Sequence, residues 1–216
     1  MKKLFLLLTV AVIFSLATSA QIKKGATFLG GQISFYNSNT DFNTAQSNQK
    51  NKYAYFNVSV GKALKENSVL GLYVSYGHNK VDNFYNGNTF GNSKLDRYNV
   101  GVFYRQYKRL AKDFYIFGEL GGGYLGSNQT DADLNGNNKV KYTQSGGELY
   151  LTPGVSYRVY KKLQLELLIP QIAGIQYSVN KTTSLANNSK QDKFQFNTNL
   201  NASLLSSLGL GFRFIL

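Results

Sequence analysis

One repeated unit constrains this chain more than any other feature: a segment of about ten residues that alternates apolar with polar or small side chains. The clearest example is LGLYVSYG, Leu70–Gly77, where Leu70, Leu72 and Val74 share one parity with Tyr76. Successive side chains of a strand point to opposite faces, so each segment has one apolar and one polar face. The gaps between segments are alternately long and short, and this pattern indicates a transmembrane β-barrel.

The first twenty residues have the composition of a secretory signal. Lys2 and Lys3 precede the apolar segment Leu4–Leu16, and Ala17–Ala20 is small and suited to cleavage. We expect a signal peptide over 1–20, cleaved after Ala20, and one outer-membrane β-barrel domain over 21–216. A membrane-anchoring helix is the alternative, but the apolar segment is short for a span.

The composition limits the possible chemistry and partners. The chain has no Cys, which excludes disulfides, thiol catalysis and Cys-based zinc sites. Its formal charge of +13 falls by two to +11 without Lys2 and Lys3. The basic residues are spread over turns and polar faces, so outer-membrane lipid and lipopolysaccharide phosphate are the expected counter-charge, and nucleic acid is not.

The alternation predicts an all-β fold, an eight-stranded antiparallel up-and-down transmembrane barrel. Pro153 on the lipid side of the sixth strand removes a hydrogen-bond donor, so we expect a bulge or break there. Aromatic residues near the strand ends suit interfacial girdles. The expected strands are about Ala26–Tyr36, Tyr53–Gly61, Ser68–His78, Leu95–Tyr107, Phe114–Leu125, Gly147–Tyr160, Leu163–Tyr177 and Phe194–Phe214.

The connections between these strands predict the topology. Three are short, namely Gly61–Asn67, Lys108–Asp113 and Lys161–Lys162. Four are long and rich in Asn, Ser, Thr and Gly, namely Asn37–Lys52, Asn79–Lys94, Gly126–Lys141 and Ser178–Lys193. Outer-membrane barrels have short periplasmic turns and longer extracellular loops, so we expect four polar extracellular loops and both termini in the periplasm.

Charged residues of both signs occupy the inward parity. Eight strands leave an interior just wide enough to be filled by side chains. We therefore expect a paired charge network and a lumen filled by side chains, without a wide pore. The inward set is Arg97, Arg105, Glu119, Glu148, Arg158, Glu166 and Arg213.

Three motifs could have indicated a catalytic or ligand site. His78, the one histidine, lies on the outward row near the rim, and we expect contact with lipid headgroups rather than catalysis. Asp131, Asp133 and Asn135 match the first half of a calcium-loop pattern, but Tyr142 stands where the bidentate Glu belongs, so calcium binding is a weak candidate. Gly121–Gly123 lies within a strand, where glycine admits a large inward side chain rather than a phosphate.

Three segments resemble the small outer-membrane β-barrel family of the OmpA/OmpX-like, porin-like type. They are FGELGGGY (Phe117–Tyr124), LTPGVSYRVYKKLQLEL (Leu151–Leu167) and LGLGFRF (Leu208–Phe214), and the resemblance spans Ala26 to Leu216. One departure is the ending Phe214-Ile215-Leu216, because many such barrels finish on an aromatic residue that is used in assembly.

The resemblance implies a Gram-negative cell-envelope protein, assembled by the barrel-assembly machinery, without a cofactor and monomeric. We expect a structural or interaction role for the loops, with a possible extracellular ligand, and no enzyme activity. A narrow porin-like channel for small solutes is one alternative, and a barrel enzyme acting on lipid or peptide is another. A soluble lipocalin-like barrel is the competing fold, which would place the inward charges in water.

Overall fold

The computed structural model describes residues 22–42, 47–85, 88–132, 139–184, 188–198 and 208–216. The expected signal peptide lies outside them. These residues form ten strands: β1 (Thr27–Phe42), β2 (Ser47–Lys65), β3 (Ser68–Tyr85), β4 (Asn88–Ala111), β5 (Phe114–Ala132), β6 (Lys139–Tyr160), β7 (Leu163–Leu168), β8 (Ala173–Thr183), β9 (Asn188–Thr198) and β10 (Gly209–Ile215). No helix in the described part of the chain is long and apolar enough to cross a membrane.

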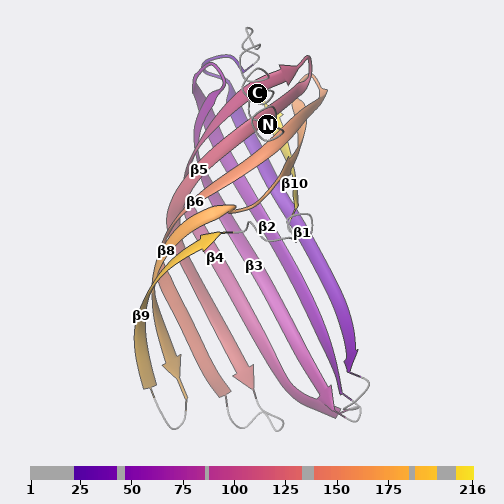
Figure 1. The fold of residues 1–216 in the computed structure, drawn as a ribbon, viewed down its shortest axis with the longest axis vertical. Coiled ribbons are helices and arrows are strands. Elements are labelled where there is room, and N and C mark those ends of the chain that lie inside the picture. The colour runs from indigo at the N-terminus through magenta and orange to yellow at the C-terminus, as the bar shows by residue number, and fades with distance from the viewer. Residues whose placement is uncertain (1–21, 43–46, 86–87, 133–138, 185–187, 199–207) are drawn as a thin grey trace, which may run out of the picture.

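The strands close into the predicted eight-stranded antiparallel barrel. Each of β1 to β6 pairs with its neighbour in sequence. Closure comes from β10, which pairs with β1 over Phe28–Gln32 and with β7 over Leu163–Leu168. The two ends of the barrel differ: Leu216 and the start of β1 lie at one end, here called the terminal end, and the long hairpins reach the other, the distal end (Figure 1).

The seventh barrel strand is interrupted, which the sequence did not predict, and of the expected eighth strand the structure describes β9 and β10. Between β7 and β8, Pro170 and Gln171 form a turn in which Gln171 has φ 47°. The expected break at Pro153 is absent from the β5–β6 ladder, where Pro153 pairs regularly with Gly118. The break lies instead between β7 and β8, the two strands that pair with the other edge of β6. The β6–β7 ladder stops at Gly154 and the β6–β8 ladder starts at Leu151, so Pro153 lies between them. Pro153 has no N–H to donate there.

The four segments expected to be long loops are mostly strand. β3 continues to Tyr85 and β4 begins at Asn88, so the segment Asn79–Lys94 forms a paired hairpin. The same holds for the other three, whose tips at 43–46, 133–138 and 185–187 lie outside the described residues. The four long polar connections that we expected as loops are therefore mostly paired strand. Beyond the membrane both faces of a strand meet water, so a polar strand lacks the apolar alternation by which strands are recognised in a sequence.

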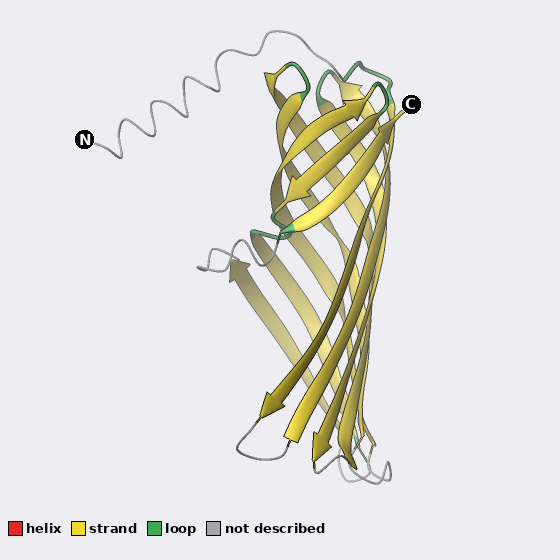
Figure 2. Ribbon diagram, turned by 90° about the vertical axis from the view of Figure 1, so that its right-hand side faces the viewer, coloured by secondary structure: helices red, strands yellow, loops and turns green. Residues whose placement is uncertain are grey.

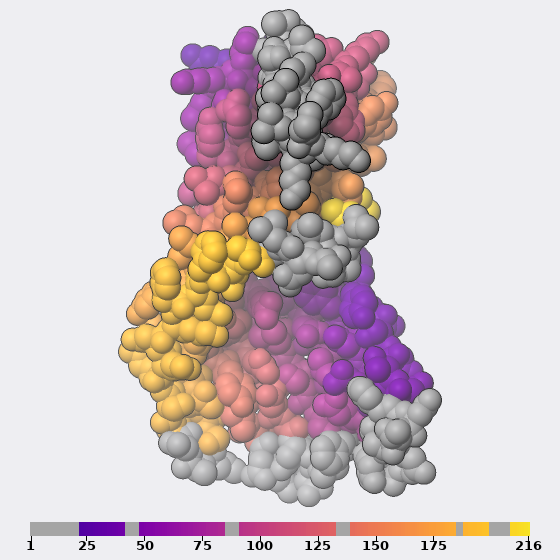
Figure 3. All heavy atoms as spheres, in the orientation of Figure 1, coloured from indigo at the N-terminus to yellow at the C-terminus, as the bar shows by residue number. Residues whose placement is uncertain are grey.

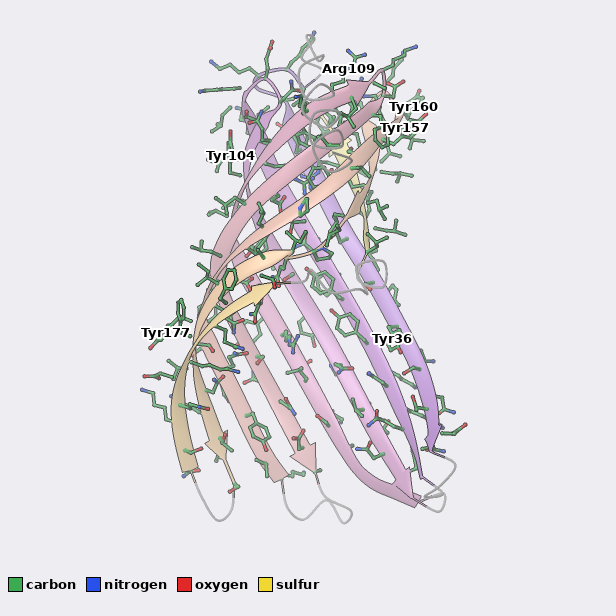
Figure 4. All side chains as sticks on the ribbon, viewed as in Figure 1. Tyr36, Tyr104, Arg109, Tyr157, Tyr160 and Tyr177 are labelled. Carbon is green, nitrogen blue, oxygen red and sulfur yellow. The ribbon has the colours of Figure 1, made fainter. Side chains whose placement is uncertain are left out.

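The predicted lipid face is confirmed, and most of the aromatic residues expected in the girdles are exposed, whereas Tyr107 is buried inside the barrel and Tyr53 lines the lumen. On β3, Leu72 and Val74 are 58% and 55% exposed, whereas the intervening Tyr73 is 5% exposed. Tyr104, Tyr157 and Tyr160 lie on the outside of the barrel near the terminal end, and Tyr177 lies farther along (Figure 4). Exposed aromatic residues at the level of Tyr177 form the second belt: Tyr76, Tyr98, Tyr124 and Phe194.

The hydrophobic core lies inside the barrel at the terminal end. Ile22, Phe28 and Tyr115 are fully buried there. Around them pack Ala63, Val69, Tyr73, Phe103, Tyr107, Phe117 and Leu168. The main-chain carbonyl of Ile22 accepts a hydrogen bond from the amide of Asn67 in the β2–β3 turn, which holds the segment before β1 against the mouth of the barrel.

Candidate functional site

Four charged side chains from four strands meet across the lumen. Arg105 on β4 contacts Glu119 on β5 at 2.7 Å and Glu166 on β7 at 2.7 Å, and Arg213 on β10 contacts Glu166 at 2.9 Å. Their side chains are only 2% to 12% exposed. We call Arg105, Glu119, Glu166 and Arg213 the charge plug. Because each guanidinium faces a carboxylate, the cost of burying these charges is offset by short ion pairs.

Aromatic side chains surround the charge plug and fill the lumen on its terminal side. The guanidinium carbon of Arg105 lies 4.1 Å from the ring centre of Phe117, a close cation–π contact. Tyr107 donates to Glu166 at 3.3 Å and accepts from Arg105 at 3.1 Å. Tyr107 also packs against the rings of Phe28, Tyr115 and Phe117, with centroids 5.6 to 6.5 Å apart. We call Phe28, Tyr107, Tyr115 and Phe117 the aromatic floor.

The other three predicted lumen charges do not join the charge plug. Glu148 accepts hydrogen bonds from the amides of Asn99 at 3.2 Å and Gln171 at 3.4 Å. Arg158 donates to the hydroxyl of Tyr115 at 3.0 Å, near the terminal mouth. Arg97 lines the distal lumen, and no ion pair joins it to another described residue. The expected network thus links Glu119 and Glu166 to two arginines of the inward set, Arg105 and Arg213, and the other three charges lie apart from it.

On the distal side of the charge plug, the lumen contains a cavity of about 720 Å³, here called the vestibule, which is bounded on its terminal side by Arg105, Glu119 and Glu166. The expected filling of the lumen by side chains does not extend to this level. The inward side chains at this level include the small residues Asn57, Ser75 and Gly77, which leave space. The wider lining includes Tyr53, Tyr55, Tyr73, Arg97, Asn99, Glu148 and Tyr150.

The barrel wall beside the vestibule is incomplete in the described part of the chain. β9 pairs with β8, and no ladder joins it to Ile33–Phe42 of β1. Figure 2 shows this side in profile, with the long strands on the opposite wall. In the space-filling view, the surface is hollowed between β9 in yellow and β1 in violet, and the inner faces of the central strands are visible (Figure 3).

Glycines on the inward face admit the bulky lumen residues, as expected for Gly121. A Cβ atom on Gly121 would overlap the ring of Tyr150, which lies opposite it in the β5–β6 ladder. A Cβ on Gly154 would in the same way overlap the ring of Phe117. The wall is therefore indented where the aromatic side chains enter the lumen.

The remaining sequence candidates show no assembled catalytic or metal site in the described part of the chain. The Nδ1 atom of His78 lies 2.8 Å from Asp96, which also accepts from the hydroxyl of Tyr76, and this cluster lies on the outward face. Asp131 accepts from Gln129 at 3.0 Å, whereas Asp133 and Asn135 lie outside the described residues. Within the described ranges, no three His, Asp or Glu residues are close enough to hold a metal ion.

A closed antiparallel barrel with an apolar outer band and aromatic belts defines an outer-membrane β-barrel protein. The chain belongs to the autotransporter β-domain family, whose model matches residues 27–215. No curated protein sequence matches it.

Solved structures share this fold at low sequence identity. A major outer membrane protein from Thermus thermophilus is 12% identical with a TM-score of 0.50, over 88% of this chain and 99% of that one. The outer membrane protein OprG from Pseudomonas aeruginosa is 15% identical with a TM-score of 0.46, over 90% and 97%. Ail, the attachment invasion locus protein of Yersinia pestis, is 12% identical with a TM-score of 0.39, over 89% and 99%. The likeness to the Thermus thermophilus protein supports the shared fold and carries no information about function.

Proposed function

We propose that this protein is a non-porin outer-membrane barrel with a structural or interaction role, which presents four polar hairpins outside the cell and does not conduct solutes through a wide pore. The observation behind this proposal is the charge plug. Glu166 and Arg213 are almost fully buried on the neighbouring strands β7 and β10, and Glu166 also pairs across the lumen with Arg105 on β4.

The energetics of the charge plug favour a permanently closed lumen. Opening a continuous path would require Arg105 to leave Glu119 and Glu166, and would separate its guanidinium from the ring of Phe117. Breaking a buried ion pair costs about 3–5 kcal/mol when one charge remains unpaired. Such a lumen is expected to open only rarely.

The hairpin lengths favour one orientation in the membrane. The turns at the terminal end are short, such as Glu66–Asn67 between β2 and β3, whereas the distal hairpins extend far beyond the aromatic belt. Outer-membrane barrels place short turns in the periplasm and longer extensions outside. The termini would then be periplasmic, where Phe214 is positioned as the aromatic residue for the barrel-assembly machinery.

The narrow channel for small solutes is the second candidate because the lumen contains the vestibule, a cavity of about 720 Å³, beside the charge plug. In that case the vestibule would be an entrance and the charge plug a movable constriction. An enzyme acting on lipid or peptide has less support, since His78 faces outward beside Asp96 and no nucleophile contacts it among the described residues.

Cysteine labelling tests the orientation, because the natural chain has no Cys to interfere. Lys141→Cys marks the distal end and Lys161→Cys marks the terminal end. In intact Gram-negative cells, a membrane-impermeant maleimide should label Lys141→Cys alone, and both variants should react after lysis. Labelling of Lys161→Cys alone in intact cells would reverse the orientation.

Solute uptake tests the closed lumen. Proteoliposomes containing the protein should swell in small sugars no faster than protein-free liposomes. Rapid swelling that falls with increasing sugar size would favour the channel instead.

A further inference from the structure

Eight of the nine described lysines in the distal half of the barrel lie on its outer face. Their positions in the ladders give them the same parity as the lipid-facing residues, so they point outward around the wall, whereas the ninth, Lys193, has the opposite parity. These eight lysines are Lys50, Lys52, Lys80, Lys94, Lys139, Lys141, Lys181 and Lys190.

The register brings several of these lysines directly opposite one another. Lys52 on β2 pairs with Lys80 on β3, and Lys80 pairs with Lys94 on β4. The same row continues through Thr130 to Lys141 on β6. A second like-charge pair joins Lys181 on β8 to Lys190 on β9. We call Lys52, Lys80, Lys94 and Lys141 the lysine row.

This arrangement opposes folding of the isolated chain. Like charges directly opposite each other in an antiparallel pair destabilise it, since their Cβ atoms are about 4.5–5.5 Å apart. Nearby carboxylates compensate only in part: Asp82 binds Lys80 at 2.6 Å, and Asp96 is engaged by His78 and Tyr76. Lys52, Lys94 and Lys141 are exposed and form no ion pair within 4 Å with a described carboxylate, although Asp96 attracts Lys94 at longer range.

The height of the lysine row matches a lipid headgroup. Lys80 and Lys94 each stand four residues beyond the aromatic belt, from Tyr76 and Tyr98, and Lys52 stands four residues beyond Phe56. Four residues of a strand extend about 13 Å, and the tilt of barrel strands reduces this to about 10 Å above the belt. A flexible lysine at this height reaches the anionic groups of the outer leaflet.

We propose that the lysine row is a binding site for the phosphate groups of lipopolysaccharide in the surrounding outer leaflet. A row of cations facing sideways, just above the apolar band, complements a phosphorylated glycolipid that packs against the barrel wall. Bound phosphates would relieve the repulsion between Lys52, Lys80 and Lys94. The proposal rests on the outer-membrane fold and does not depend on whether the lumen is closed.

The test compares binding of lipopolysaccharide by purified protein in neutral detergent, measured by microscale thermophoresis. The triple variant Lys52→Gln/Lys80→Gln/Lys94→Gln removes three charges from the row. Each lysine near an anionic surface contributes about fivefold in affinity, so the triple variant should bind about 100-fold more weakly. The matched control, Lys62→Gln/Lys161→Gln/Lys162→Gln, removes three exposed charges at the terminal end and should bind as the natural protein does.

Two further comparisons separate phosphate recognition from altered folding. Lys52→Arg/Lys80→Arg/Lys94→Arg keeps the charges and should retain most of the affinity. Lipopolysaccharide stripped of its phosphates should bind the natural protein about as weakly as intact lipopolysaccharide binds the Gln variant. If the triple Gln variant does not fold, Lys94→Gln alone should weaken binding about fivefold.

Equal binding of phosphorylated and dephosphorylated lipopolysaccharide would overturn the proposal, as would equal losses in the row variant and the terminal-end control. Conductance measured on the same preparations reports separately on the closed lumen, so the two proposals fail independently.

Discussion

Replacing Glu166 by Gln perturbs the charge plug with almost no change in volume. Glu166 is paired with both Arg105 and Arg213, and its side chain is 2% exposed. In the variant Arg105 keeps its ion pair with Glu119, but Arg213 loses the one carboxylate that faces it among the described residues. A buried pair that loses one member costs about 3–5 kcal/mol, because an uncompensated charge remains buried. We expect Glu166→Gln to lower the free energy of unfolding by about that amount.

The assay is urea unfolding in lipid vesicles, followed by far-UV circular dichroism and by the heat-modifiable shift on a gel. Glu148→Gln is the matched control, since Glu148 accepts hydrogen bonds from neutral side chains, among them Asn99 and Gln171, and forms no ion pair with a described residue. That control should cost about 1 kcal/mol or less. The double variant Glu166→Gln/Arg213→Met should regain part of the loss, because the unpaired charge is gone. A cost below about 1 kcal/mol for Glu166→Gln, or an equal cost for Glu148→Gln, would refute the assignment of the charge plug as a paired, desolvated cluster.

Three further substitutions test the wall and the outward face. Gly121→Ala should destabilise the barrel by about 1–3 kcal/mol in the same assay, because the added Cβ overlaps the ring of Tyr150. Gly118→Ala is the control and should be neutral, because no atom lies within 4 Å of its added Cβ. Equal effects of the two substitutions would contradict the indented wall. Val102→Lys places a charge in the lipid-facing band and should lower the free energy of unfolding by about 2–4 kcal/mol. The yield of the heat-modifiable form should fall, and a normal yield would contradict the placement of Val102 in that band. His78→Ala should leave barrel formation unchanged and abolish no lipase or protease activity measured on the purified protein, and loss of such an activity would establish a catalytic role for this residue.

The lipid face and strand identity could be predicted from the sequence because period-2 alternation survives wherever one side of a strand meets lipid. Leu72 and Val74 point outward and Tyr73 inward for that reason. The distal extensions were missed because they have water on both sides. Asn79–Lys94 has the composition of a loop, yet its described residues pair across β3 and β4 with a single register shift at Asn83/Phe84.

The parts of the site that depend on register could not be predicted. Parity assigned Arg105, Glu119 and Arg97 to the same inward face, but it does not say which residues on different strands lie at the same height. Arg105 lies opposite Glu119, whereas Arg97 lies eight residues away along β4 and in the vestibule. The lysine row was missed for the same reason, since Lys52, Lys80 and Lys94 are far apart in sequence and meet only through the ladders.

The interruption of the seventh strand shows a further limit of local reasoning. Pro153 and Pro170 both remove a donor, and the sequence alone suggested the first as the site of a break. In the barrel Pro153 stays in register with β5, and its carbonyl accepts a hydrogen bond from Ile169 at 3.0 Å, just before the turn at Pro170. The irregularity therefore lies in the neighbouring strand, between β7 and β8.

Single-channel recording in planar bilayers tests the central claim, the closed lumen, most directly. The natural protein, inserted after purification in its heat-modifiable form, should give no large and stable conductance steps. The variant Arg105→Ala/Phe117→Ala, which removes side chains from the charge plug and the aromatic floor, should show channel activity that the natural protein lacks. Large, stable steps from the natural protein would contradict the account, because a lumen crossed by Arg105, Glu166 and Arg213 leaves no wide aqueous path.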